Sequence, residues 1–219
     1  MTGISIAIDG PAGAGKSTVS KALASAAGFA LLDTGAMYRA ATWLCIQQSA
    51  LGNEQKIARV IIDHCVEINI DHGKTLAYVD GNEITEFLRD REVTAAVSEV
   101  AAVKDVRDWA VRVQRTVVEN ELAQGNGIVL EGRDIGTTVL PNASFKFFLT
   151  ASDEKRAQRR ALEVSAAPEV ILGEIIKRDE LDSSRAISPL RQAEDAILID
   201  ASDMTVDQVV QKILEIVGH

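Results

Sequence analysis

The sequence has little cysteine, no long apolar run and no excess of positive charge. Its two cysteines, Cys45 and Cys65, are typical of buried thiols in a reducing compartment, so neither a structural disulfide nor a metal site is expected. No apolar stretch approaches the length of a membrane span. The first residues also lack the basic and apolar regions of a signal peptide. We therefore expect a cytoplasmic protein with no membrane partner.

The charge balance excludes further classes of partner. A net charge of -9 at pH 7 argues against non-specific binding to nucleic acid or to a membrane surface. Arginine nevertheless outnumbers lysine by 14 to 9, and the arginines occur in clusters. Because guanidinium groups suit phosphate geometry, this pattern favours a local site for a small polyanion. Any single arginine is equally compatible with a solvated surface charge.

Short apolar segments alternate with helical patterns along the 219 residues, without repeats or extended linkers. This order predicts an α/β fold with a central parallel five-stranded sheet flanked by helices. The predicted strands cover residues 4–8, 29–32, 128–130, 145–149 and 196–199. The predicted helices cover 16–27, 36–48, 54–64, 91–102, 103–123, a stretch after 152–154, 168–181 and 206–217. Period-two alternation over 65–80, around a turn at 71–74, predicts an inserted β-hairpin.

One glycine-rich stretch organises the rest of the chain. It reads Gly10-Pro11-Ala12-Gly13-Ala14-Gly15-Lys16-Ser17 and matches the phosphate-binding loop pattern, between a predicted strand and a predicted helix that Gly28 ends. Its backbone N–H groups can surround an anion, and the helix N-terminus adds positive charge. We expect this loop and Thr18 to bind a nucleoside triphosphate, with Lys16 at the β and γ phosphates and Ser17 on Mg²⁺. The alternative is a plain glycine-rich turn with a lone lysine.

Polar residues follow the second and third predicted strands as well as the first. Asp33 and Thr34 follow the second strand, and residues 131–134 follow the third. Ligands of such sheets bind at the carboxyl ends of the strands, so we expect one common site. Asp33 can also serve as a helix N-cap, and Glu131 either orients Mg²⁺ through water or is a turn carboxylate. Asp9 either supports the site or pairs with a backbone amide.

The distribution of arginines favours a kinase over a nucleotide hydrolase. No Asn-Lys-x-Asp guanine-reading motif is present. Arg39 and Arg133 lie beside strand ends, where they can hold an acceptor phosphate, and later arginines can close over the donor and exclude water. These later residues are Arg156, Arg159, Arg160, Arg178 and Arg185. Their alternatives are a solvated helix face and a chain of surface ion pairs.

Four segments in order over nearly the whole chain resemble bacterial cytidylate kinases, a family in the nucleoside monophosphate kinase group. They are residues 9–17, Leu32-Asp33-Thr34-Gly35-Ala36-Met37-Tyr38-Arg39, Glu131-Gly132-Arg133-Asp134-Ile135-Gly136-Thr137, and Arg178-Asp179 followed by Asp182 and Arg185. Many enzymes share the glycine loop, whereas the second and third segments together are far more specific. The predicted hairpin at 65–80 falls within the match.

The resemblance implies a P-loop nucleoside monophosphate kinase fold and the activity of that family. The activity is phosphorylation of CMP and dCMP to CDP and dCDP by in-line transfer from ATP with Mg²⁺, a step of pyrimidine nucleotide metabolism. It implies a core formed by residues 1–34, 104–153 and 183–219, a CMP-binding insert at 35–103 and a short helical lid at 154–182. The partners are small molecules, without nucleic acid, and the protein is expected to be a monomer.

The resemblance also implies roles for individual residues. The CMP phosphate is assigned to Thr34, Arg39, Arg133 and Arg185, and the sugar with its phosphate to Tyr38, Arg178 and Asp182. Cytosine is assigned to Ser98, Arg107 and Asp134. Catalysis is assigned to Lys16, Arg133, Arg159 and Arg185, and Arg156 joins the loop in ATP binding. Two features depart from the family pattern: Thr34 replaces a common Ser, and the segment between Arg160 and Pro168 is short.

The implied cytosine site agrees with the chemistry of its side chains. Asp134 can accept a hydrogen bond from the exocyclic amine, while Arg107 and Ser98 can donate to the ring acceptors. Uracil carries a carbonyl in place of that amine, so UMP would leave a buried carboxylate facing an acceptor. The alternatives are a kinase for another nucleotide and a nucleotide-binding module without phosphoryl transfer.

Overall fold

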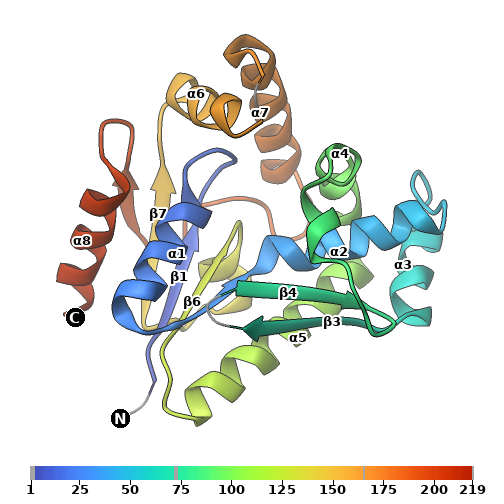
Figure 1. Cartoon of the computed structure of the whole chain (residues 1–219), viewed down its shortest axis with the longest axis horizontal. Coiled ribbons are helices and arrows are strands. Elements are labelled where there is room, and N and C mark those ends of the chain that lie inside the picture. Colours follow the sequence, from blue (N-terminus) through green and yellow to red (C-terminus); the bar gives the residue numbers. More distant parts are fainter. Residues whose placement is uncertain (1–2, 72–73, 165, 219) are drawn as a thin grey trace.

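A five-stranded parallel sheet forms the centre of the molecule, with the loop-bearing strand in the middle (Figure 1). The computed structural model describes residues 3–71, 74–164 and 166–218. The strand order is β2-β6-β1-β7-β8, and every neighbouring pair is parallel. The strands are β1 (Ser5–Asp9), β2 (Ala30–Asp33), β6 (Ile128–Gly132), β7 (Phe145–Thr150) and β8 (Ile197–Asp200). The predicted sheet is confirmed.

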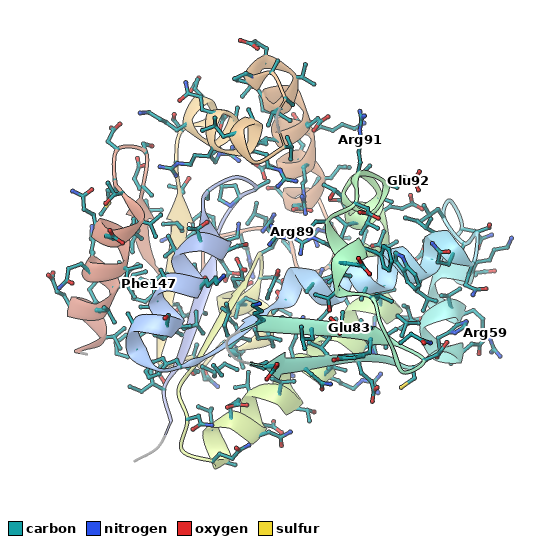
Figure 2. All side chains as sticks on the ribbon, viewed as in Figure 1. Arg59, Glu83, Arg89, Arg91, Glu92 and Phe147 are labelled. Carbon is teal, nitrogen blue, oxygen red and sulfur yellow. The ribbon has the colours of Figure 1, made fainter. Side chains whose placement is uncertain are left out.

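Helices cover both faces of this sheet, which explains its apolar strands. Successive strand residues point to opposite faces, so Ile6 and Ile8 pack with α1 (Lys16–Ala27) and α8 (Val206–Val217). Ala7 faces the other side, toward α2 (Thr34–Gln47) and α5 (Lys104–Ala123). Charged side chains such as Arg59, Glu83 and Arg91 are exposed, whereas Phe147 is buried in the sheet (Figure 2).

The segment between α2 and α5 carries the predicted β-hairpin. It contains α3 (Glu54–Asp63), β3 (Val66–Asp71), β4 (Lys74–Val79), β5 (Asn82–Glu83), the 3-10 helix η1 (Thr85–Arg89) and α4 (Arg91–Val100). The antiparallel pair β3–β4 is confirmed, while part of the predicted turn, residues 72–73, lies outside the described residues. The hairpin contacts the sheet where the Asp33 N–H donates to Thr75 Oγ1 at 2.9 Å.

Two helices after the central strands pack onto the glycine-rich loop. They are α6 (Asp153–Val164) and α7 (Pro168–Ser183), and Figure 1 shows them beyond the carboxyl ends of the strands. Ala12 of the loop joins a small apolar cluster with Ala157 on α6 and Ile175 on α7. The loop is therefore in contact with both helices.

Most helix predictions agree with the structure. Helix α2 begins two residues earlier than predicted because the Asp33 side chain caps it by accepting from the Ala36 N–H at 3.1 Å. A single π-helical turn, η2 (Ile135–Val139), follows Asp134 and was not predicted. Cys65 is exposed, so its predicted burial is wrong, whereas Cys45 is buried. None of the described helices is long and apolar enough to cross a membrane.

Candidate phosphate and nucleotide site

The loop between β1 and α1 is shaped by glycine. Gly10 has φ +150°, and a Cβ there would lie 2.0 Å from the carbonyl oxygen of Leu149, so no other residue fits. Gly15 is the N-cap of α1 and supplies no side-chain acceptor for the first turn. An anion can therefore take these N–H groups.

Lys16 is buried beside this loop and donates a hydrogen bond to its backbone. Its Nζ donates to the Pro11 carbonyl at 2.7 Å. Burial lowers the pKa of Lys16 well below its usual value, and the positive charge of Arg133 lowers it further. A polyanion in the loop would stabilise the charged ammonium, because nearby opposite charge counteracts the cost of burial.

Ser17 and Glu131 form an oxygen-rich corner next to Lys16. Ser17 Oγ donates to Glu131 Oε2 at 2.9 Å, and Asp33 lies opposite Glu131 in the β2–β6 register. Burial raises the pKa of Glu131 to about 7, and the Asp33 carboxylate adds to the rise. Hydroxyl and carboxylate oxygens are ligands that Mg²⁺ prefers. Among the described residues, no cluster of three or more His, Cys, Asp or Glu side chains could hold a metal ion.

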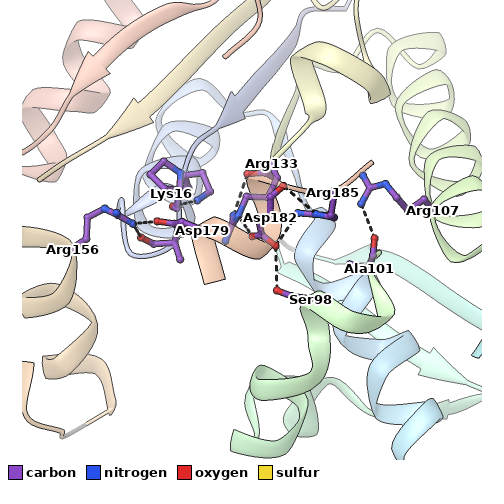
Figure 3. Close-up of polar contacts among 12 residues, drawn as sticks. Lys16, Ser98, Ala101, Arg107, Arg133, Arg156, Asp179, Asp182 and Arg185 are labelled. Carbon is purple, nitrogen blue, oxygen red and sulfur yellow. Dashed lines mark hydrogen bonds and ion pairs between the residues drawn. The ribbon is translucent and has the colours of Figure 1, made fainter. Parts of the chain in front are cut away.

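Asp182, near the end of α7, forms ion pairs with Arg133 and Arg185 (Figure 3). The positive charge of Arg178 also acts on it. The carboxylate is 4% exposed and accepts from Arg133 Nε at 3.0 Å and Arg185 Nη2 at 2.9 Å. Ser98 Oγ on α4 donates to Asp182 Oδ1 at 3.2 Å, the oxygen that also pairs with Arg185. Burial lowers the pKa of Arg178 to about 10, with the Arg133 charge next in effect, and its Nε is buried without a partner. Three cations around one carboxylate leave excess positive charge for a phosphate.

Thr34 and Arg39 border the same region from the start of α2. Thr34 Oγ1 donates to the Glu131 carbonyl at 2.7 Å, which joins the ends of β2 and β6. Arg39 Nη1 lies 3.4 Å from Asp33 Oδ2, which is a long ion pair. A phosphate could replace the Asp33 carboxylate as the partner of this guanidinium. Both residues thus lie beside the strand ends, as predicted.

A buried ion pair lies on the insert side of this site. Arg107 and Asp134 are 2% and 3% exposed, and Arg107 Nη2 pairs with Asp134 Oδ2. Arg107 Nη1 also donates to the Ala101 carbonyl at 3.1 Å, and its guanidinium lies 5.3 Å from the Tyr38 ring centroid. Burial raises the pKa of Tyr38 to about 12. The pair presents a donor and an acceptor side by side, which can recognise a base edge.

Two of the three arginines on α6, Arg156 and Arg159, contact the glycine-rich loop. Arg156 Nη1 donates to the Ala12 carbonyl at 2.6 Å, and Arg159 Nη1 approaches the Ala14 carbonyl at 3.5 Å. Asp179 completes a closed set of contacts, because Oδ1 accepts from the Ala12 N–H at 2.9 Å and Oδ2 pairs with Arg156 (Figure 3). The sequence contains Asp179 within the Arg178 segment, but no local signal gave it a role.

The predicted residues therefore fall into three neighbouring groups. The loop with Lys16 and Ser17 lies at the centre, the residues around Asp182 lie beside it, and Arg107 with Asp134 lies next to these. Arg156 and Arg159 contact the loop from α6. No role was predicted for Asp179 or for Arg115, which donates to the carbonyls of η2. Asp179 lies within the segment around Arg178 and Asp182, whereas Arg115 belongs to no recognisable local pattern.

Comparison with known proteins identifies close relatives of the sequence. A family model described as cytidylate kinase matches residues 6–219. A cytidylate kinase from Caldicellulosiruptor bescii is 44% identical over 222 residues, covering 99% of this chain and 96% of the relative. One from a Geobacillus species is 46% identical, covering 99% and 97%. A bifunctional pantoate ligase/cytidylate kinase from a Synechococcus species is 45% identical over 94% of this chain and 42% of its own length.

Solved structures with low sequence identity share the fold. An uncharacterised protein from Eubacterium ventriosum has a TM-score of 0.55 at 14% identity, covering 98% of both chains. A sugar kinase from a Janibacter species has a TM-score of 0.50 at 12% identity, covering 97% of this chain and 93% of its own. At such identities the similarity concerns the fold alone.

Proposed function

We propose the roles of the site residues from one premise, that this chain belongs to the cytidylate kinase family. The protein accordingly transfers a phosphoryl group from ATP to CMP. We infer that dCMP is a second acceptor and that Mg²⁺ accompanies ATP. We further infer a monomer in the cytoplasm, where both nucleotides are available.

The observation that carries this proposal is the cluster of arginines around Asp182 beside Lys16. A nucleotide hydrolase needs one phosphate site and a water molecule, whereas a nucleotide kinase must hold two phosphorylated ligands end to end. The glycine-rich loop accounts for the first ligand. Arg133, Arg178 and Arg185 supply the second concentration of positive charge, next to the loop.

The donor side is assigned to the loop, residues 10–17, together with Thr18 and Arg156. Lys16 would exchange the Pro11 carbonyl for phosphate oxygens. Because burial and the charge of Arg133 disfavour its ammonium form, the negative charge of the phosphates would stabilise it. Ser17 would ligate Mg²⁺, with Glu131 orienting its water ligands. Bound Mg²⁺ neutralises phosphate charge during transfer.

The acceptor side is assigned to Thr34, Arg39, Arg133 and Arg185 for the CMP phosphate, and to Tyr38, Arg178 and Asp182 for the sugar and phosphate. An oxygen of the CMP phosphate forms the new bond to the γ-phosphorus as the bond to the β-phosphate oxygen breaks, and ADP leaves. Lys16, Arg133, Arg159 and Arg185 stabilise the charge on the transferred group.

Cytosine recognition is assigned to Arg107 and Asp134, with Ser98 nearby on α4. Asp134 accepts from the exocyclic amine, and Arg107 donates to the ring acceptors. The Ser98 hydroxyl is bonded to Asp182, so it would have to turn from that carboxylate to reach the base. We place residues 35–103 as the CMP-binding insert and 154–182 as the lid on a core of 1–34, 104–153 and 183–219.

ADP formation from MgATP with CMP, dCMP, UMP, AMP or GMP, against a water-only control, tests the proposal. Turnover with CMP and dCMP and little with UMP is expected. Strong UMP turnover would retain the kinase and overturn the base-reading assignment. ADP formation that no nucleotide stimulates would overturn the acceptor assignment and favour a nucleotide-binding module.

A further inference from the structure

The turn after Asp134 is held at its start by a carboxylate from another strand. Asp9 ends β1, directly before Gly10, and is 4% exposed. Its Oδ1 accepts from the Ile135 N–H at 2.8 Å, and its Oδ2 accepts from the Gly136 N–H at 2.7 Å. These are the first two amides of η2, whose N–H groups have no partner within the turn itself.

The same turn is held at its end by a guanidinium. Arg115 on α5 donates from Nε to the Val139 carbonyl and from Nη2 to the Thr138 carbonyl, both at 2.9 Å. A negative group at the amide end and a positive group at the carbonyl end both match the dipole of a helical turn. The turn is thus clamped from β1 and from α5.

The clamped turn is connected directly to Asp134. The Asp134 carbonyl accepts from the Thr138 N–H at 2.9 Å and from the Val139 N–H at 3.1 Å. A shift of the turn must therefore move the Asp134 backbone. It would also move the carboxylate that pairs with Arg107.

We propose that Asp9 and Arg115 are positioning residues for base recognition, which fix the turn 135–139 and thereby hold the Asp134 carboxylate in place against Arg107. This inference rests on the proposed function, because it assigns these residues to the discrimination of CMP from UMP. Asp9 adjoins the glycine-rich loop, so one residue joins the donor loop to the base-reading turn.

The burial of Asp9 supports a role beyond packing. A buried carboxylate is costly unless hydrogen bonds satisfy it, and burial raises the pKa of Asp9 to about 6 although both amide bonds lower it. Discrimination between an amine and a carbonyl requires the reading group to stay within hydrogen-bond distance, so small displacements matter. Two charged anchors on one five-residue turn provide that rigidity.

The first test compares Asp9→Asn with Asp200→Asn as a matched control. Asp200 also ends a strand of this sheet and accepts from the Ser202 N–H at 2.9 Å. The Asp9→Asn amide replaces one accepting oxygen by a donor that faces an N–H. We expect the ratio of kcat/KM for CMP over UMP to fall about tenfold, equivalent to about 1.4 kcal/mol. The control should retain the wild-type ratio within about twofold.

The second test acts on the other end of the turn and decides the matter if Asp9→Asn does not fold. Arg115→Met removes both donors but keeps an apolar stem. Arg112→Met, on the same helix and equally exposed, is the control. We expect the CMP-to-UMP ratio to fall about threefold in Arg115→Met, because exposed hydrogen bonds contribute less than buried ones.

Amide hydrogen exchange at Ile135 and Gly136 provides a readout independent of activity. Faster exchange together with a lower ratio would support the proposal. An unchanged ratio in folded Asp9→Asn, or in folded Arg115→Met if the former does not fold, would overturn it. Wild-type protein that does not prefer CMP would overturn the proposed function instead. Unchanged amide exchange at Ile135 and Gly136 in Asp9→Asn would show that Asp9 does not hold the turn.

Discussion

At the scale of single residues, the cations of the site have protein partners that bind them less strongly than nucleotide phosphates would. Lys16 donates to a carbonyl, and Arg39 pairs loosely with Asp33. Arg133 and Arg185 share the one Asp182 carboxylate. Each cation could exchange its present partner for a phosphate oxygen, which would release the Pro11 carbonyl or the carboxylates of Asp33 and Asp182. These exchanges make the site suitable for two polyanions.

The clearest prediction at this scale concerns the loop lysine. Lys16→Ala should lower kcat by at least about a hundredfold, as for removal of other groups that stabilise transition-state charge. The fold should persist, because the variant also removes a costly buried ammonium. Steady-state ADP formation with CMP, alongside thermal unfolding, measures both effects. Lys21→Ala, on the exposed side of the same helix, is the control, and near-normal turnover in Lys16→Ala would contradict the assigned role.

A second prediction concerns the direction of the hydrogen bond between residue 134 and the base. Asp134→Asn replaces an acceptor oxygen by an N–H donor that suits the uracil carbonyl. We expect the CMP-to-UMP ratio to fall about a hundredfold or more, because the wild-type site leaves a buried group unpaired with uracil. The KM for ATP should change little. Equal weakening of CMP and ATP would instead indicate a general structural role for Asp134.

A third prediction at this scale concerns the ionisation of Asp9. Burial raises the pKa of Asp9 to about 6, above its usual value of 3.8, so the folded protein binds this proton more tightly than the unfolded chain does. This contribution to stability is therefore present at low pH and is lost as the pH rises through about 4 to 6. From pH 5 to pH 7 the loss is about 1 kcal/mol.

Chemical unfolding of wild type and Asp9→Asn at pH 5 and pH 7 measures this term. The charges of Asp134 and Lys16, which also act on Asp9, are present in both proteins. The wild-type free energy of unfolding should decline more between the two pH values than that of the variant. Parallel declines would show that Asp9 does not titrate in this range.

At the scale of elements, the helices α6 and α7 contact the glycine-rich loop. Arg156 donates to the carbonyl of Ala12, Asp179 accepts from the N–H of the same residue, and the two side chains pair. The backbone of Ala12 thus joins both helices to the loop. Movement of this pair of helices away from the loop must break both Ala12 contacts, whereas the Arg156–Asp179 pair joins the two helices to each other.

Asp179→Asn should loosen this attachment. The amide keeps one accepting oxygen but removes the charge that pairs with Arg156, so residues 153–183 should exchange amide hydrogens faster without nucleotide. Glu180→Gln, the exposed neighbour on the same helix, is the control. Identical exchange in the two variants would mean that apolar contacts around Ala12 alone hold the helices.

At the scale of the whole molecule, the sheet determines where the proposed substrates meet. The carboxyl ends of β1, β2 and β6 bring the loop, Thr34 and residues 131–134 to one edge. The insert contributes Ser98, and α7 contributes Asp182, whose hydrogen bond joins these outer parts across the site. Closure around two nucleotides would exclude water from the transfer, since both outer parts already contact the centre.

The sequence by itself determined the sheet, most helices and the loop, because these depend on local information. Apolar periodicity marks the strands and helices, and the spacing of Gly10, Gly15 and Lys16 marks the loop. The order of strand ends also placed Thr34 and residues 131–134 in one site. Burial of a single residue is less local, and the prediction for Cys65 was wrong because the residue lies in an exposed connection before β3.

Only the tertiary structure decided which charged groups are partners. Arg133 and Asp182 are 49 positions apart, Asp9 and Ile135 are 126 apart, and Ala12 and Asp179 are 167 apart. No local pattern encodes such pairs, because they form when separate elements pack against the same edge of the sheet. The positions of the cations could therefore be predicted from the chain, whereas the carboxylates and backbone groups that hold them depend on the fold.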